Sequence, residues 1–241
     1  MRYLKKSIKY LSLILVIFFF LFLNFNSKSV LAIKQVSILG SLVNILPIRN
    51  YFEWKNSSID TNIPQILYDY SIVDGEINQD IESFTDKIII EFYQELSKEN
   101  YQSVKIDYQV VTDNSEWFTL KIMVLKIMAS SDSYVKYYHI DKKENKIVLL
   151  SDLFRSKEYK TIISDEIKKQ MRKQMQENIE VVYWIDGISD EEFKEITDNQ
   201  NFYFNSKNNI VIVFNKYEVA PGSMGLPEFE IDKKVYEKYL K

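Results

Sequence analysis

The residues that most often carry chemistry are scarce in this chain, which has one histidine, His139, and no cysteine among 241 residues. One imidazole and no thiolate come close to excluding a zinc site with nitrogen and sulfur ligands, and they exclude thiol catalysis. His139 follows two tyrosines on an expected strand, so we interpret it as a partly buried or surface strand residue rather than a catalytic base. No nucleophile elbow, phosphate-binding loop or dinucleotide-binding glycine motif occurs, and the sequence predicts no cofactor.

Carboxylates are the remaining candidates for catalysis. An acidic group lies between Trp184 and Glu195, and two further acids flank the C-terminal loop; the residues are Asp186, Asp190, Glu191, Glu192, Glu195, Glu218 and Glu228. A pair of carboxylates is what a glycosidase needs. The 186–195 spacing also fits a solvated helix start capped by Ser189, and we favour that interpretation. It lacks the alternating oxygen ligands and the glycine of a calcium loop, and no metal site is predicted.

The segments that must position these residues show either the apolar spacing of a helix or the apolar alternation of a strand. Apolar spacing of three and four predicts a helix over 76–98 and a second over 158–176, and a short helix is favoured over 36–46. Alternating or continuous apolar runs predict strands over 63–70, 104–110, 117–128, 133–140, 147–150, 202–204 and 210–214. A helix, several strands, a helix and further strands indicate an α+β fold, with antiparallel sheet packed with two longer helices rather than a parallel βαβ sheet.

The first 32 residues have the layout of an export signal. Five basic residues and no acid surround an apolar run at 11–23, and residues 29–32, Ser-Val-Leu-Ala, fit signal peptidase cleavage after Ala32. A retained membrane anchor is the alternative, although the run is shorter than the roughly 17 to 25 residues of a spanning helix. Both alternatives place the remainder of the chain outside the cytoplasm, secreted or on the outer face of the membrane.

Export would leave an acidic protein. Removing the five basic residues of the leader from a total of 31 leaves 26, against 34 acidic residues, so the net charge becomes −8. This acidity argues against a nucleic-acid partner, because neutralising phosphates requires a clustered basic face. It favours a basic partner.

The C-terminal segment 214–229 contains two of the four prolines and two of the five glycines, and it lies between two apolar strands. Such a segment is expected to be an ordered loop. It can be a structural crossover or a partner-binding loop. For the binding alternative, the candidate contact residues are Tyr217, Pro221, Met224, Leu226 and Pro227.

The phrase F-N-x-Y-E-V-A-P-G-x-x-G-x-P-E-F over 214–229, with the strands at 201–204 and 211–214, resembles the extracellular domain of the anti-sigma-V factor family. Residues 134–154 and 63–66 are similar to the same family and to a companion domain found ahead of peptidoglycan deacetylase domains. The resemblance covers about residues 60–232. It implies an extracytoplasmic α+β module that, in this family, recognises the basic enzyme lysozyme.

We therefore expect a leader or anchor at 1–32, a linker at 33–60, an N-terminal α+β part at 61–155 and a C-terminal family-like part at 156–241. Only about nine residues precede the apolar run, so a cytoplasmic sigma-binding segment is not expected. The first hypothesis is a non-enzymatic domain that binds a basic lysozyme-like protein or a cell-wall glycan. The alternatives are a carboxylate enzyme acting on wall polysaccharide and a purely structural envelope protein.

Overall fold

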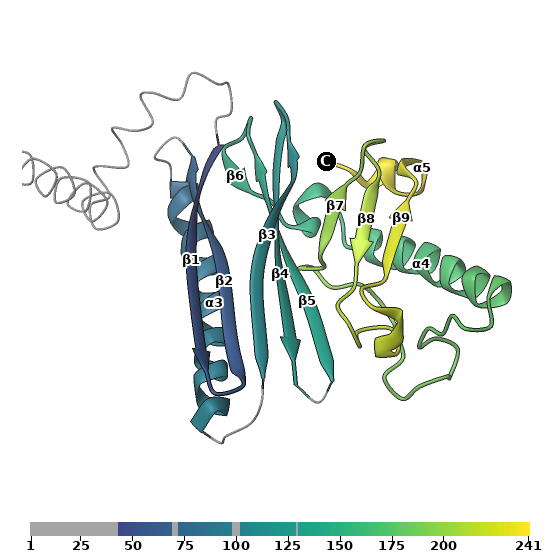
Figure 1. The fold of residues 1–241 in the computed structure, drawn as a ribbon. Coiled ribbons are helices and arrows are strands. Elements are labelled where there is room, and N and C mark those ends of the chain that lie inside the picture. Colours follow the sequence, from purple (N-terminus) through teal and green to yellow (C-terminus); the bar gives the residue numbers. More distant parts are fainter. Residues whose placement is uncertain (1–42, 69–71, 98–101, 129) are drawn as a thin grey trace, which may run out of the picture. The chain divides into compact units, whose positions relative to one another are not determined.

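The computed structural model describes residues 43–68, 72–97, 102–128 and 130–241, which all belong to one compact unit, Leu42–Lys241. The expected leader with its cleavage site at Ala32 lies outside these residues. Figure 1 shows the elements, which are β1 (Val43–Trp54), β2 (Ser57–Tyr68), α3 (Ile72–Ser97), β3 (Ser103–Asp113), β4 (Trp117–Ile127), β5 (Ser131–Asp141), β6 (Lys146–Ile147), η1 (Leu150–Leu153), α4 (Glu158–Glu177), β7 (Phe202–Phe204), β8 (Ile210–Val213), η2 (Gly222–Met224), β9 (Glu228–Ile231), α5 (Lys233–Tyr236) and η3 (Glu237–Tyr239).

Strands β1 to β6 form one sheet in which neighbours in sequence are also neighbours in space. From β3 to β6 the pairs are antiparallel, as the alternation predicted. Strands β2 and β3 run parallel, with residues 58–61 opposite 103–106, and α3 connects them. The α+β class with antiparallel sheet is confirmed, but it includes one local βαβ crossover that the sequence interpretation did not contain.

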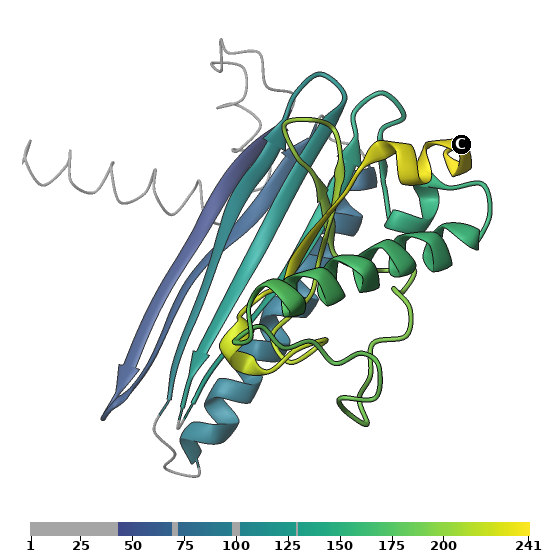
Figure 2. The ribbon, with the colours of Figure 1, turned by 90° about the vertical axis from the view of Figure 1, so that its right-hand side faces the viewer.

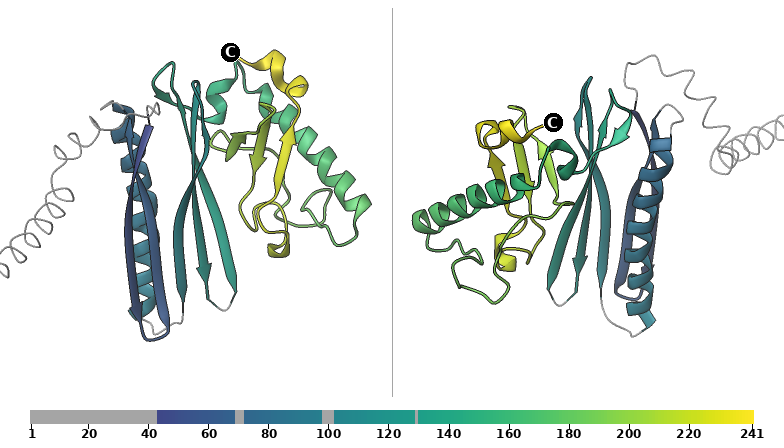
Figure 3. Two further views of the ribbon diagram at one scale, coloured as in Figure 1. Left: turned by 45° about the horizontal axis from the view of Figure 1, so that its top comes forward. Right: turned by 180° about the vertical axis from the view of Figure 1, so that it is seen from behind.

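Helix α3 covers one face of this sheet, as Figures 1 and 3 show. Its buried side is formed by Ile77, Ile81, Ile88 and Phe92, which pack in one cluster with strand residues that include Ile106. The spacing of four and seven residues places these side chains on a single helix face. Because strand side chains alternate, residues between the core positions of β3 and β4 point to the opposite face of the sheet.

The C-terminal elements build a second core. Strands β7, β8 and β9 form an antiparallel sheet, and Figure 2 shows α4 lying across it. Ile163, Ile167 and Met171 of α4 are completely buried together with Ile210 and Ile212 of β8. The 20-residue helix therefore owes its position to this apolar stripe, since its remaining surface is charged.

The two cores are joined along the outer edge of β5. The Asn201 side chain donates to the Val135 carbonyl at 2.9 Å and accepts from the Tyr137 backbone N–H at 3.2 Å. Asn215 accepts from the Val135 N–H at 2.8 Å. These side-chain amides hydrogen-bond to backbone N–H and C=O groups at the edge of β5, where no neighbouring strand pairs with them.

Several sequence expectations differ from the structure. Residues 43–46, assigned to a short helix, begin β1, and residues 43–60, placed in the linker, form β1 and the start of β2. The expected strand at 147–150 is limited to Lys146–Ile147, because η1 begins at Leu150. The expected capped helix after Ser189 does not form, since residues 189–196 adopt turns and irregular structure. The expected boundary between an N-terminal part ending at residue 155 and a C-terminal part beginning at residue 156 stays a prediction.

No helix within the described ranges is long and apolar enough to cross a membrane. The longest helix, α3, contains seven acidic residues and a lysine among its 26 residues.

Candidate functional site

The loop between β8 and β9 projects one large aromatic side chain. Tyr217 is 49% exposed, and its backbone is in the left-handed region with φ of 66°. The Glu218 carboxylate accepts from the Asn215 N–H at 2.7 Å and from the Gln200 amide at 3.3 Å, which fixes the turn on both sides of Tyr217. A tyrosine in this conformation is costly, and the surrounding hydrogen bonds keep it there.

The Tyr217 ring lies against Gly222 at the start of η2. A Cβ atom added at Gly222 would come within 2.4 Å of the ring, so glycine is what permits this contact. The Lys216 ammonium lies 5.1 Å from the ring centroid. The ring therefore contacts both a cation and the loop backbone, while about half of its surface remains open to solvent.

The loop is anchored beneath Tyr217 by apolar contacts. Val219 and Ala220 are buried, and Met224 is a half-buried side chain that packs on the second core. Pro227 is buried, and its carbonyl accepts from the Phe214 N–H at 2.9 Å. Pro221 is half-buried and precedes η2. Of the five predicted contact residues, Met224 and Pro227 thus mainly support the loop.

Leu226 brings the loop to the open face of the large sheet. It lines a pocket of about 270 Å³ whose other walls come from β3, β4 and β5, including Asp107, Met123, Leu125 and Val135. Leu125 is 37% exposed, so part of the apolar surface at this pocket is open to solvent. Sequence reasoning missed these strand residues, although the double-sided apolar character of 117–128 was a signal for them.

Charges at this pocket are balanced by local pairs. Asp107 accepts from the Asn62 side chain at 2.8 Å and from the Tyr108 N–H at 2.9 Å. Although burial acts in the opposite direction, these bonds and the nearby Lys105 lower the pKa of Asp107. The carboxylate is therefore held ionised beside an apolar surface, which suits recognition of a partner rather than proton transfer.

The single histidine is part of the structural junction. His139 is 3% exposed, stacks on Phe202 with ring centroids 4.0 Å apart, and has Nδ1 3.1 Å from the Thr119 hydroxyl. Burial lowers the pKa of His139 to about 3, so the ring is neutral. The expectation of a strand histidine holds, but the side chain is fully rather than partly buried.

The acidic group at 186–195 is solvated. Asp186 is exposed and forms a two-bond ion pair with Arg172, both distances being 2.7 Å, and this pair lowers the pKa of Asp186. Glu192 accepts from the Asp186 N–H at 2.7 Å. Glu228 accepts from the Tyr203 hydroxyl at 2.9 Å. In the part of the chain that the structure describes, no group of three or more acidic or histidine side chains could hold a metal ion.

Comparisons with known proteins agree on one family. A family model described as "Protein of unknown function (DUF3298)" matches residues 151–234. The anti-sigma-V factor RsiV of Bacillus subtilis (strain 168) is 32% identical over 228 residues, which is 93% of this chain and 80% of that protein.

Two solved structures share the fold. A DUF3298 family member from Bacteroides fragilis NCTC 9343 superposes with a TM-score of 0.61 at 14% identity, covering 84% of this chain and 96% of that one. A DUF3298 protein from Pseudomonas aeruginosa PAO1 gives a TM-score of 0.51 at 12% identity, with 84% and 95% coverage. The two-core α+β arrangement is therefore that of DUF3298-containing proteins. At the level of sequence, the chain belongs to the RsiV family, which confirms the resemblance.

Proposed function

We propose that this protein is an extracytoplasmic, non-enzymatic regulatory domain that binds a basic lysozyme-like protein through the Tyr217 loop and the neighbouring open face of the sheet. The observation that carries the proposal is the exposed Tyr217, held in a left-handed conformation on the same loop as Leu226, which lines an apolar pocket. Rigid, half-exposed aromatic side chains beside an apolar pocket are typical of interface anchors.

The family relationship supports a binding role. The relative is named an anti-sigma factor, which is a regulator that acts by binding protein. The anti-sigma-V resemblance on residues 214–229 supplies lysozyme as the candidate ligand, and export would give a domain of net charge −8 that complements a basic enzyme. Three of the candidate carboxylates, those of Glu192, Glu218 and Glu228, accept hydrogen bonds within turns or from a neighbouring tyrosine.

Calorimetry tests this proposal directly. The full chain in a non-ionic detergent is titrated with a chicken-type lysozyme at about 20 mM and about 150 mM salt. We expect binding that weakens with salt, and at least a tenfold loss of affinity in Tyr217→Gly, because an aromatic anchor is removed. Tyr93→Ala is the matched control, since Tyr93 is similarly exposed at 48% but lies on α3.

Lysozyme activity measured in the same samples distinguishes inhibition from binding alone. Absence of binding at both salt concentrations would refute the proposal. Release of reducing ends from wall polysaccharide by this protein, abolished by Glu218→Gln, would replace it with the enzymatic alternative.

A further inference from the structure

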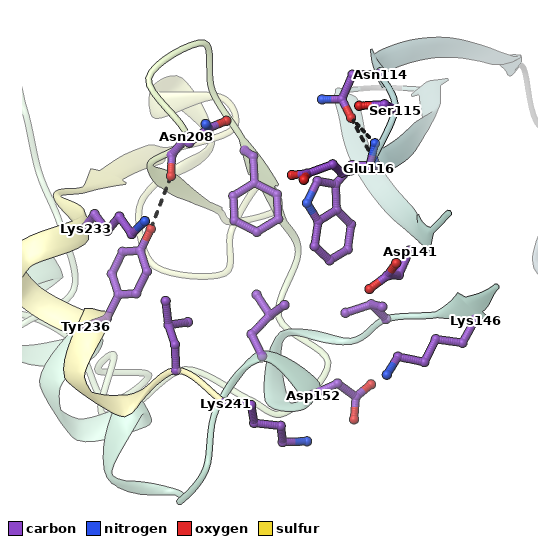
Figure 4. A pocket seen from close by; sticks show the side chains of 15 residues that line it. Asn114, Ser115, Glu116, Asp141, Lys146, Asp152, Asn208, Lys233, Tyr236 and Lys241 are labelled. Carbon is purple, nitrogen blue, oxygen red and sulfur yellow. Dashed lines mark hydrogen bonds between the residues drawn. The ribbon is translucent and has the colours of Figure 1, made fainter. Parts of the chain in front are cut away.

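Two surface features lie outside the proposed interface. One is a pocket of about 620 Å³ between the β3–β4 turn and α5, drawn in Figure 4. Its lining holds lysines and carboxylates together, namely Lys146, Lys233, Lys241, Glu116, Asp141 and Asp152, so it does not favour a ligand of either charge. The other feature is the outer edge of β1, which presents apolar side chains and backbone groups to solvent.

Strand β1 is a long edge strand without a second neighbour. It lies at the end of the six-stranded sheet and pairs on one side only, with β2 (Figure 1). The outer edge of β5, by contrast, is bound by Asn201 and Asn215. The other edge strands, β6, β7 and β9, contain only two to four residues each. A 12-residue edge such as β1 is a template for pairing with another chain.

Two facing prolines indicate which backbone groups of β1 point outward. Pro47 lies opposite Pro64, and because neither has an N–H, this is a pair without hydrogen bonds. Pair types alternate along an antiparallel ladder, so residues 49, 51 and 53 also direct their N–H and C=O groups away from β2. Ser58, opposite Glu53, agrees with this, because its N–H donates away from β1 to the Gln102 carbonyl at 3.0 Å. No other described residue hydrogen-bonds to these outward groups of β1.

Apolar side chains cover most of this edge. Trp54 is 57% exposed and Tyr51 is 65% exposed, and Ile48 and Phe52 are exposed as well. Phe52 extends the apolar surface onto α3, where its ring centroid lies 5.5 Å from that of Tyr93. Exposed apolar side chains gathered on an unpaired strand are typical of a surface that another chain covers.

We infer that β1 pairs antiparallel with β1 of a second copy of this chain, about a two-fold axis at Tyr51. The only charged residues of β1, Arg49 and Glu53, lie two residues before and two residues after Tyr51. This register therefore places Arg49 of each copy opposite Glu53 of the other, and it places Ile48 opposite Trp54. The outward groups of residues 49, 51 and 53 then form about six backbone hydrogen bonds between the copies.

The charges select this register over its neighbours. An axis at residue 49 or at residue 53 would place Arg49 opposite Arg49 or Glu53 opposite Glu53, and like charges directly opposite are destabilising. An axis at residue 52 would oppose Arg49 and Lys55, and an axis at residue 50 would oppose Glu53 and Pro47, which has no N–H to donate. With the axis at Tyr51, Pro47 faces residue 55, beyond the end of β1, so its missing N–H costs no bond within the ladder.

This pairing occupies the free edge of both copies, so the assembly closes at a dimer. The loop that contains Tyr217 and Leu226 lies against β3, β4 and β5, on the other side of β2 from β1. The dimer therefore leaves both loops free. The inference does not depend on what these loops bind.

The first test measures association of the full chain in a non-ionic detergent, with micelles in large excess so that two chains seldom share one by chance. Sedimentation velocity in a density-matched buffer gives the dimer fraction as a function of protein concentration. We expect a dimer with a Kd between about 1 and 100 µM, the range of a small interface.

Charge reversal tests the register. Arg49→Glu and Glu53→Arg should each raise the Kd about tenfold or more, because like charges then face each other at both positions. An equimolar mixture of these two variants should dimerise as the wild type does, since opposite charges again face each other in the mixed pair. This recovery excludes misfolding as the cause of the loss. Lys87→Glu, an equal charge change at an exposed position of α3, is the matched control and should dimerise as the wild type does.

Distances between spin labels test the antiparallel axis. The chain has no cysteine, so Tyr51→Cys and Leu46→Cys each take one nitroxide label at a defined position. The two labels at residue 51 should lie close together, and those at residue 46 should be about 30 Å further apart, because each residue away from the axis adds about twice the strand rise. Pulsed electron paramagnetic resonance measures both separations.

The inference is overturned if the wild type stays monomeric up to about 300 µM, well above the expected Kd, which would leave this edge to a strand of a different protein. It is also overturned if the two charge-reversed variants dimerise as tightly as Lys87→Glu, if their mixture stays monomeric, or if the labels at residues 46 and 51 give equal separations.

Discussion

Two residues in this fold are held in states that the same side chain would avoid in a peptide. Tyr217 has a positive φ, and His139 is a titratable ring without access to solvent. Left-handed backbone costs roughly 1–2 kcal/mol in a residue with a Cβ, and burial of a cation costs more. Tyr217 is exposed, so its left-handed conformation does not contribute to core packing. His139, by contrast, stacks on Phe202 inside the junction between the two cores.

Replacing Tyr217 by glycine separates stability from recognition. Glycine adopts positive φ without strain, so Tyr217→Gly should leave the free energy of unfolding within about 1 kcal/mol of the wild type. Urea titration measures this, with Tyr217→Val as the control, because a β-branched residue should tolerate the left-handed region less well. A loss of several kcal/mol in the glycine variant would show that the ring is structural.

His139 should make stability depend on pH. Burial lowers its pKa from 6.5 to about 3, so below pH 6.5 the unfolded chain binds a proton that the native ring does not. The native state should therefore lose about 1.4 kcal/mol per pH unit, between about pH 6 and pH 4, relative to His139→Phe. Urea titrations at pH 7, 5.5 and 4.5 measure the difference, in which the carboxylate contributions common to both proteins cancel. If the difference in unfolding free energy between the wild type and His139→Phe is constant with pH, His139 does not have the lowered pKa assigned to it.

At the scale of elements, the outer edge of β5 explains how two separate hydrophobic clusters are joined. β6 pairs only with residues 140 and 141 of β5. Further along β5, Asn201 and Asn215 bind the backbone of residues 135 and 137, and the Lys216 ammonium donates to the Ser131 carbonyl. Side chains from the second core thus occupy the place of a neighbouring strand.

Asn201→Ala should weaken this junction. It leaves the Val135 carbonyl and the Tyr137 N–H without their partner, and each unsatisfied buried group costs about 1–3 kcal/mol. We expect the thermal unfolding transition to broaden or divide into two, measured by calorimetry. Asn62→Ala is the control, because among the described residues the Asn62 side chain bonds to two other side chains, those of Asp107 and Arg49, and its loss should cost less. A single unshifted transition in Asn201→Ala would show that the two clusters are joined chiefly by aromatic packing.

Some elements of the fold could be predicted from the sequence and others could not. Strong periodicity predicted α3, α4 and the central strands, since their buried faces repeat over many residues. The strand at 43–54 could not be found in this way because its outer residues are exposed over most of its length. Ser189 was read as a helix cap, and its hydroxyl does accept from the Glu191 N–H at 3.1 Å, as the oxygen of a cap would. No helix follows, because a capping bond alone does not propagate a helix and residues 191–196 form turns and irregular structure. The pocket at Leu226 joins residues about 100 positions apart, so local patterns could not predict it.

For the whole molecule, the distribution of charge matters more than its sum. Helix α3 contains seven acids and one base, whereas α4 contains four acids and five bases. The negative field is thus concentrated on the helix that covers the face of the sheet opposite the Leu226 pocket. For the proposed basic partner, long-range attraction would thus come from α3 and short-range contact from the Tyr217 loop, which are different surfaces.

Association kinetics should separate these two contributions. Glu82 and Asp86 are exposed on α3. The double variant Glu82→Lys/Asp86→Lys should lower the association rate constant for a basic lysozyme several-fold at about 20 mM salt, and it should match the wild type near 0.5 M salt because the charges are then screened. Its dissociation rate constant should stay within about twofold, whereas Tyr217→Gly should chiefly raise dissociation. Surface plasmon resonance measures both constants, with Glu82→Asp/Asp86→Glu as the charge-conserving control. If the α3 variant instead raises the dissociation rate, helix α3 itself contacts the partner, and the proposed interface at the Tyr217 loop has to be moved.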